Sequence, residues 1–293
     1  MATLRDVRSR IAGVKKTQKI TRAMKMVAAA KLRRAQNGVV GARPYAAKMK
    51  QLLQLLSGQV QEQVDPLLTS REVRNVVLVV VTADRGMCGA FNSNLIKTAI
   101  QHVNETYPRW LEQGRVKLIC IGKKGADFFG KRKFKVTGVY IGVYGQLVFP
   151  QAQAIARDLV QGYLKGDYDR VEVIYNEFKN IAQSRIVVDQ FLPVPPVDQT
   201  GGSVSFVDYI YEPSKERILE AIVPKHLNFQ IWRVLLESNA AEQGARMAAM
   251  ENATKNANDM IRQLQLQYNK ARQASITKEL LEVVGGAEAL SQA

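Results

Sequence analysis

The sequence has 293 residues, and its 42 lysines and arginines exceed its 26 aspartates and glutamates to give a formal net charge of +16. Two cysteines without metal-ligand spacing exclude a disulfide framework and a zinc module. No apolar run approaches the roughly 20 residues of a membrane-spanning helix. We therefore expect a soluble protein of a reducing compartment, able to dock on a membrane-embedded partner, with Cys88 and Cys120 as small buried apolar residues.

The positive charge is concentrated in residues 1–50, which hold fourteen basic side chains and one acidic side chain, Asp6. A segment with this charge needs an acidic partner: nucleic acid, an anionic membrane surface or acidic loops on a protein. A coiled coil that binds nucleic acid is therefore one hypothesis. Against it, the basic segment contains a single aromatic residue, Tyr45, for stacking on bases.

The same N-terminal segment has the pattern of a coiled-coil helix. Apolar residues recur at alternating steps of three and four, as in a coiled-coil seam: Leu4, Val7, Ile11 and Val14, then Ala28, Leu32, Ala35 and Val39. Gln18, Thr21 and Lys25 occupy the seam positions between these two groups. The composition favours helix throughout, so we predict one helix over 4–57, kinked near 41–44.

The middle of the chain, 74–212, has the alternating pattern of an α/β domain. A run of valine and leucine at 76–81 predicts a fully buried strand. Strands and helices then alternate: helix 92–104, strand 116–121, helix 126–129, strand 134–139 and helix 151–164. This order predicts a Rossmann-like sheet with parallel crossovers. Three more strands with short connections, 171–178, 185–191 and 204–211, predict that the far side of the sheet is antiparallel.

Two glycine turns, 86–89 (GMCG) and 122–125 (GKKG), follow predicted strands at positions where α/β proteins can bind phosphate. Neither turn has the spacing of a phosphate-binding motif, so we interpret them as turns whose glycines need positive φ. His102 and His226 are far apart in the sequence, and we expect neither to have carboxylate or cysteine ligands nearby. We interpret both as ordinary surface or interface histidines. We find no nucleophile, catalytic triad or metal constellation and expect no catalytic residue, metal or cofactor.

The C-terminal part of the chain predicts one long helix over 214–284, ended by Gly285 and Gly286. One face carries small residues, which allow close approach of another helix: Ala240, Ala241, Ala245, Ala248, Ala249, Ala253 and Ala257. An apolar seam continues beyond them with Met260, Ile261, Leu264, Tyr268 and Ala271. A helix this long cannot bury a seam against itself. We therefore expect the helical domains 1–57 and 214–293 to form an antiparallel coiled coil, with the Rossmann-like mixed-sheet domain inserted between them.

Three stretches resemble the gamma subunit of the F-type ATP synthase: 11–36 (IAGVKKTQKITRAMKMVAAAKLRRAQ), 83–92 (ADRGMCGAFN) and 237–290, which contains YNKARQASITKELLEVVGGAEAL. The resemblance implies a rotary shaft along the axis of a hexamer of alpha and beta subunits, with the α/β domain on the membrane ring of c subunits and beside epsilon. The catalytic sites would belong to the beta subunits, and rotation would couple proton flow to ATP synthesis. The location implied is peripheral, on the cytoplasmic face of a bacterial inner membrane.

The resemblance also implies which residues contact other subunits. Segments 23–26 and 271–277 match family segments that contact acidic loops of the beta subunits. With the polar seam residues they give a candidate catch of seven residues: Gln18, Thr21, Met24, Lys25, Arg272, Gln273 and Thr277. Antiparallel pairing is expected to bring the two groups to nearby heights. Tyr211 and Glu212 match a family position that faces the polar loops of the c ring.

Overall fold

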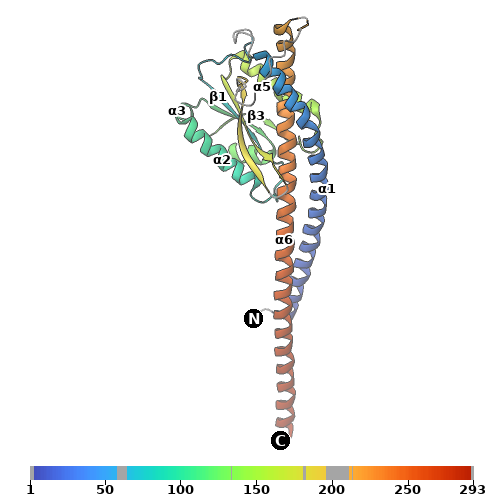
Figure 1. Ribbon diagram of the computed structural model, residues 1–293. Coiled ribbons are helices and arrows are strands. Elements are labelled where there is room, and N and C mark those ends of the chain that lie inside the picture. Colours follow the sequence, from blue (N-terminus) through green and yellow to red (C-terminus); the bar gives the residue numbers. More distant parts are fainter. Residues whose placement is uncertain are drawn as a thin grey trace. The chain divides into compact units, whose positions relative to one another are not determined.

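The computed structural model describes residues 3–57, 65–132, 134–180, 183–195, 211–212 and 214–291. The chain divides into two compact units, a smaller one of residues 1–28 and 247–293 and a larger one of residues 29–246. Helices α1 (Leu4–Ser57) and α6 (Lys215–Ser291) contribute to both units, and Figure 1 follows them along the chain by colour. The bounds of α1 confirm the predicted helix over 4–57.

Within the smaller unit, α1 and α6 run antiparallel. The Oγ1 atoms of Thr21 and Thr254 lie 2.7 Å apart, and Lys25 Nζ lies 2.7 Å from Glu251 Oε1. Residues later in the sequence of α1 thus contact residues earlier in the sequence of α6. The buried or half-buried positions keep the predicted three- and four-residue steps on both helices: Leu4, Val7, Ile11 and Val14 on α1, with Ile261, Leu264, Tyr268 and Ala271 on α6. The predicted antiparallel pair is confirmed.

The same two helices also pack antiparallel within the larger unit. The rings of Tyr45 and Phe229 lie 4.5 Å apart between centroids. Gly38 lies so close to α6 that a Cβ built on it would come within 3.2 Å of Leu236 Cδ2. The seam residues of this part of α1 are buried: Leu32, Ala35, Val39, Ala42, Met49 and Leu53. A small residue at position 38 therefore allows the close helix approach.

Among the described residues, a five-stranded sheet forms the core of the larger unit, in the order β3-β2-β1-β4-β5. Its strands are β1 (Val76–Val81), β2 (Val116–Ile121), β3 (Lys135–Tyr140), β4 (Arg170–Phe178) and β5 (Ser184–Leu192). Strands β1 to β4 pair in parallel, and β5 pairs antiparallel with β4. This confirms the predicted mixed sheet. The strand predicted at 204–211 falls outside the described residues except for Tyr211, which is not in a strand.

Helices cover both faces of this sheet. Val77, Val79 and Val81 pack with α5 (Phe149–Lys165) and α6, whereas alternate residues of the same strand, such as Leu78 and Val80, pack with α2 (Phe91–Thr106) and α4 (Lys123–Phe129). Figure 1 shows α2 and α6 on opposite sides of the sheet. Every residue of β1 is buried because both faces are covered, which explains its uninterrupted apolar run. The short helix α3 (Pro108–Glu112) was not predicted.

Two expectations about α6 are wrong. The helix continues through Gly285 and Gly286 to Ser291 instead of ending there, and neither glycine has a positive φ. Glycine costs only about 1 kcal/mol relative to alanine inside a helix, and the strong helix formers that follow offset this cost. Met260, assigned to the seam, is 51% exposed, because the seam passes through the neighbouring Ile261.

Replacing Gly122 by alanine tests how tightly the turn after β2 is packed. Gly122 has φ +96°, and a Cβ there would lie 2.0 Å from Thr82 O, so the backbone must move. We expect Gly122→Ala to lower the free energy of unfolding by at least about 3 kcal/mol, measured by urea denaturation followed by tryptophan fluorescence.

Gly114→Ala is the matched control for this substitution. Gly114 also has a positive φ, +66°, but a Cβ there meets nothing within 4 Å. Its expected cost is only the backbone strain, about 1 to 2 kcal/mol. Equal losses for both variants would show that the contact with Thr82 does not matter.

Candidate functional site

The turns after β1 and β2 lie at the carboxyl edge of the sheet, where α/β folds commonly bind ligands. Here the first amides of α4 already have partners within the chain. The N–H of Lys123 donates to Asp84 Oδ1 at 3.0 Å, that of Lys124 to Ala83 O at 3.1 Å, and that of Gly125 to Thr82 Oγ1 at 2.8 Å. A phosphate at this helix end would have to displace these acceptors and approach the Asp84 carboxylate. The turn therefore joins two strands and leaves no free phosphate cradle at this helix end.

The glycine interpretation of these turns is confirmed in part. Gly122 and Gly89 have positive φ, +96° and +59°, whereas Gly86 does not. Met87 lies between Gly86 and Gly89 and has φ 62°, and its side chain is 69% exposed. Positive φ is uncommon for a residue with a side chain, so the turn holds this methionine outward against a backbone preference.

Both cysteines are buried and unpaired, as predicted. Burial raises the pKa of the Cys88 thiol and raises the pKa of Cys120 to about 12. Neither thiol is therefore ionised near neutral pH. Nucleophilic chemistry needs the ionised thiolate form. Within the described ranges, no group of three or more His, Cys, Asp or Glu side chains is placed to hold a metal ion.

A buried ion pair connects the turn after β1 to α6 within the larger unit. Arg246 donates to Glu242 Oε1 and to the backbone oxygen of Gly86, both at 2.6 Å. The two side chains are only 12% and 7% exposed. Removing two charges from water is costly, and short charge-assisted hydrogen bonds offset that cost. The guanidinium of Arg246 thus positions this turn against the helix.

A second polar cluster connects α6 to β4 and β5. Arg233 lies 3.3 Å from Asp189 Oδ2, which also accepts a hydrogen bond of 3.0 Å from the Tyr175 hydroxyl. One turn further along α6, the carboxyl of Glu237 is buried, and its Oε2 has no hydrogen-bond partner among the described residues. Burial raises the pKa of Glu237, and the nearby Arg233 guanidinium opposes this effect. The clusters of Arg246 and Arg233 are together called the α6 clamps.

The expectation that His102 has no carboxylate neighbour is wrong. Its Nε2 lies 2.6 Å from Glu172 Oε2, and Glu172 also accepts hydrogen bonds from Tyr107 (2.7 Å) and Arg170 (3.0 Å). Burial raises the pKa of Glu172, but the hydrogen bonds from His102 and Tyr107 hold it below its usual value. Since His102 and Glu172 are far apart in sequence, no local pattern indicated the pair. Burial lowers the pKa of His226 to about 4.

The polar seam residues of α1 pair with α6 in the smaller unit. Hydrogen bonds or ion pairs join Gln18 to Asn258, Thr21 to Thr254 and Lys25 to Glu251. Thr21 is buried, and Met24 and Lys25 are half-buried. The polar interruption of the seam is therefore matched by polar residues on the partner helix, which favours this register over shifted ones.

The expectation that the polar group on α6 lies beside the polar residues of α1 along the coiled coil is wrong. This group consists of Arg272, Gln273 and Thr277. Gln18 pairs with Asn258, fourteen residues before Arg272, which corresponds to about 21 Å along the helix. Instead this group lies near where α1 begins. All three side chains are exposed, and the Thr277 hydroxyl donates to Gln273 O at 3.0 Å.

Beyond that group, the end of α6 exposes apolar side chains. Every described side chain from residue 276 to 287 is exposed. Five of them are large and apolar, with 48 to 70% of their surface exposed: Ile276, Leu280, Leu281, Val283 and Val284. An apolar group of this size on one helix end is typical of a surface that another chain covers.

The two residues predicted to face the polar loops of the c ring, Tyr211 and Glu212, lie just before α6. Tyr211 is half-buried and packs against the apolar core between α6 and the sheet, and the ammonium of Lys215 lies 4.8 Å from its ring centroid. Glu212 is exposed. The structure therefore leaves the carboxylate of Glu212 accessible and gives Tyr211 a packing role. In the part of the chain that the structure describes, no helix is both long and apolar enough to cross a bilayer.

These features define a class of protein: a coiled coil of both terminal helices that carries an α/β domain between them in the sequence. A family model described as ATP synthase matches residues 3–290. Over their whole lengths, ATP synthase gamma chains of Chloroherpeton thalassium and Chlorobaculum parvum are 54% and 53% identical; the alignments cover 100% of this chain, and 99% and 100% of theirs. The chain belongs to the family of ATP synthase gamma chains.

Solved structures agree with this assignment. A chain in the central stalk and c-ring structure of the Tetrahymena thermophila mitochondrial ATP synthase is 25% identical, with a TM-score of 0.59, and the match covers 80% of this chain and 99% of that one. A rotor chain of the Euglena gracilis mitochondrial ATP synthase, 22% identical, shares the fold with a TM-score of 0.68 over 93% and 98% of the two chains. The alternative of a nucleic-acid-binding coiled coil receives no support from these proteins.

The unpartnered carboxyl of Glu237 predicts a pH-dependent stability. Its pKa is raised in the folded protein, so the stabilisation from protonation is complete below about pH 4.3, the ordinary value for glutamate, and is lost as the pH rises through the folded pKa. We expect Glu237→Gln to be about 1 kcal/mol more stable than the wild type at pH 8, with the difference shrinking toward pH 4.5.

Urea denaturation at several pH values measures this difference. The titratable and charged groups near Glu237 are Arg233, Arg43, Glu177, Asp189 and Tyr175, and they are unchanged in the variant. Glu220→Gln, on an exposed position of the same helix, is the control and is expected to show no such trend. A wild type that is more stable than Glu237→Gln at pH 8 would contradict the assignment.

Proposed function

We propose that this gamma chain is the central stalk of an F-type ATP synthase and turns inside a ring of alternating alpha and beta subunits. One observation carries the proposal: α6 extends beyond its last pairing with α1 and exposes five large apolar side chains there. A helix end of this kind needs an apolar surface of another chain around it. The proposed ring supplies that surface. Because the stalk lies on the axis of the ring and is asymmetric, it can act on three catalytic sites in turn.

Transmission of rotation depends on firm contacts within the stalk. In the larger unit, the α6 clamps join the helix to the sheet at two places, through Arg246 and through Arg233. The working parts that we propose are a helical segment 1–57, an α/β domain 74–212 and a second helical segment 214–293. Torque received by the α/β domain would pass through the clamps into α6.

The catalytic sites belong to the beta subunits in this proposal, and this chain contributes none. The arrangement at the carboxyl edge of the sheet supports that division, because Thr82, Ala83 and Asp84 accept the hydrogen bonds that a phosphate would need. The chain acts instead by its shape and by weak contacts. Exposed charge pairs of about 0 to 1 kcal/mol can form and break at each step of rotation.

The other partners we propose are the c ring of the membrane and the epsilon subunit, with the chain as a peripheral subunit on the cytoplasmic face of a bacterial inner membrane. Its bacterial relatives support this location. Glu212 is exposed just before α6 begins and is our candidate for contact with polar loops of the c ring. Proton flow through the membrane sector would then turn ring and stalk together.

The purified chain is expected not to bind ATP with useful affinity, because the α4 amides are already engaged. Isothermal titration calorimetry of the isolated chain with magnesium ATP checks this. A nucleotide-binding protein titrated in the same buffer serves as the positive control. Saturable micromolar binding would show that the turn can open to accept phosphate and would contradict the structural role assigned to it.

Arg272→Leu and Gln273→Leu are expected to lower ATP turnover in the assembled complex about tenfold and to reduce the coupling of turnover to proton pumping. A hydrogen bond from either side chain to an acidic loop of a beta subunit would be worth about 1.5 to 3 kcal/mol. ATPase rate and proton pumping are measured side by side on the same preparations. Assembly is checked by the subunit composition of the purified complex.

The chain offers a matched control for this pair, because Arg262 and Gln263 repeat the same dipeptide on exposed positions of the same helix. Arg262→Leu and Gln263→Leu are expected to leave both rates near wild type. If the control variants lose as much activity as the variants at 272 and 273, the effect is general to the helix. The proposed contact of Arg272 and Gln273 with the beta subunits is then refuted.

A further inference from the structure

A long groove runs along α2 in the larger unit, where α4 lies beside it. Its volume is about 880 Å³, and it is lined by eight residues of α2 and two of α4. The lining begins at Asn92 and ends at Glu105, so the groove follows α2 for about 20 Å, or nearly four helical turns. Neither the coiled-coil seam nor the α6 clamps use these residues.

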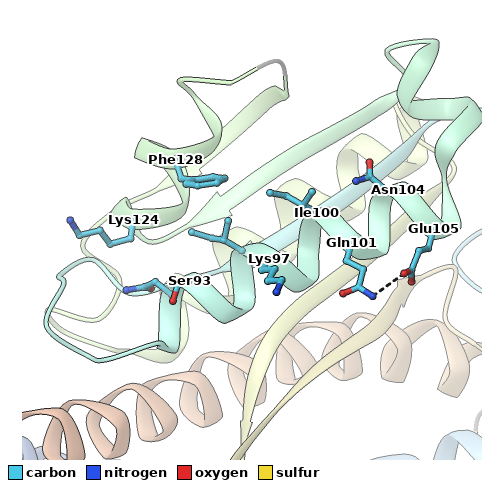
Figure 2. Close-up of a pocket in the computed structure, with 10 residues that line it drawn as sticks. Ser93, Lys97, Ile100, Gln101, Asn104, Glu105, Lys124 and Phe128 are labelled. Carbon is cyan, nitrogen blue, oxygen red and sulfur yellow. Dashed lines mark hydrogen bonds between the residues drawn. The ribbon is translucent and has the colours of Figure 1, made fainter. Parts of the chain in front are cut away.

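The floor of the groove is apolar. Ile96 is buried, and Ile100 and Phe128 are half-buried. Figure 2 shows Ile100 of α2 and Phe128 of α4 facing each other across the groove. At the far end, Gln101 Nε2 donates to Glu105 Oε1 at 2.8 Å, so these two polar groups satisfy one another. Small-molecule sites place several polar groups around one ligand, whereas this groove is elongated and its polar groups are spread along it.

Two of the three charged residues that line the groove are lysines. Lys97 and Lys124 are exposed, and neither forms an ion pair with a carboxylate of the described residues. Residues 123–132, which form α4 and the turn after it, contain four basic residues and one acidic residue. The guanidinium of Arg132 lies over the Phe128 ring, 3.6 Å from its centroid. An occupant therefore needs an apolar stripe flanked by negative charge.

We propose that the groove between α2 and α4 docks an acidic amphipathic helix of another protein chain. Its apolar stripe covers Ile96, Ile100 and Phe128, and its carboxylates pair with Lys97 and Lys124. A helix laid into a groove through residues at i, i+3, i+4 and i+7 has the length and shape that this surface requires. A second copy of this chain is a poor occupant, because it carries the same two lysines and the same net charge of +16. None of these groove residues is among those assigned above to contacts of the proposed stalk function.

The test uses the full-length chain and two synthetic helical peptides of sixteen residues. Both have leucine at positions i, i+4, i+7 and i+11; the first carries glutamate on its flanks and the second carries lysine. Fluorescence anisotropy measures the binding of each labelled peptide. We expect saturable micromolar binding of the glutamate peptide and at least tenfold weaker binding of the lysine peptide.

Charge reversal in the groove assigns the binding to this surface. Lys97→Glu combined with Lys124→Glu is expected to weaken binding of the glutamate peptide at least tenfold and to strengthen binding of the lysine peptide. The matched control is Arg157→Glu combined with Lys165→Glu, which makes the same charge change on exposed positions of α5 and is expected to alter affinity less than twofold. Ile100→Glu is expected to abolish binding of both peptides. Circular dichroism confirms that each variant keeps its helical content.

Several outcomes overturn the proposal. These are the absence of saturable binding, equal binding of the two peptides, and an equal loss of affinity in the α5 control. A dimer of the wild-type chain that Ile100→Glu converts to a monomer in sedimentation analysis would identify a second copy as the occupant instead. If the double lysine variant fails to fold, Lys97→Gln combined with Lys124→Gln replaces it, with an expected loss of about threefold or more.

Discussion

The antiparallel pairing of α1 and α6 is the interaction on which the structure depends, because neither helix can bury its apolar seam alone. Isolated helices gain little stability from propensity, and packing of an apolar face supplies most of it. In the smaller unit this packing is specified by polar pairs, such as Thr21 with Thr254, that a shifted register would break. In the larger unit Gly38 permits close contact with Leu236. The register of the two helices is thus set by polar pairs in the smaller unit and by close packing in the larger unit.

Charged side chains, buried at Arg246 and half-buried at Arg233, have a different role in the larger unit, where they hold α6 against the sheet. Arg246 reaches the turn after β1, and Arg233 reaches Asp189 on the edge strand β5. Charge-assisted hydrogen bonds are directional, so they fix the rotation of the helix relative to the strands more closely than apolar packing does. A subunit that transmits torque needs this kind of contact. Glu237 Oε2, which has no hydrogen-bond partner among the described residues, is one place where this arrangement costs stability.

The α/β domain has the sheet topology of a ligand-binding fold, but hydrogen bonds within the chain occupy the position where such folds usually bind a ligand. Its sheet has a switch between β1 and β4, where crossovers lead to opposite sides, and such points commonly bind nucleotides. Here Thr82 and Asp84 accept the hydrogen bonds of the α4 amides, and Arg246 reaches the neighbouring turn at Gly86. Fold alone therefore does not determine the function, because the side chains at the strand ends decide what can bind.

The sequence by itself determined the helix over 4–57, the positions of the five described strands along the chain and the family, because each rests on local periodicity or on continuous motifs. It did not determine that α6 passes through Gly285 and Gly286, since helix formers beyond a weak glycine signal outweigh it. The contact of His102 with Glu172, and the distance between Gln18 and Arg272 along the coil, were decided only by the tertiary structure. The physical reason is common to both cases: which polar groups meet depends on register and strand order, and these are set by burial of apolar surface far from the groups themselves.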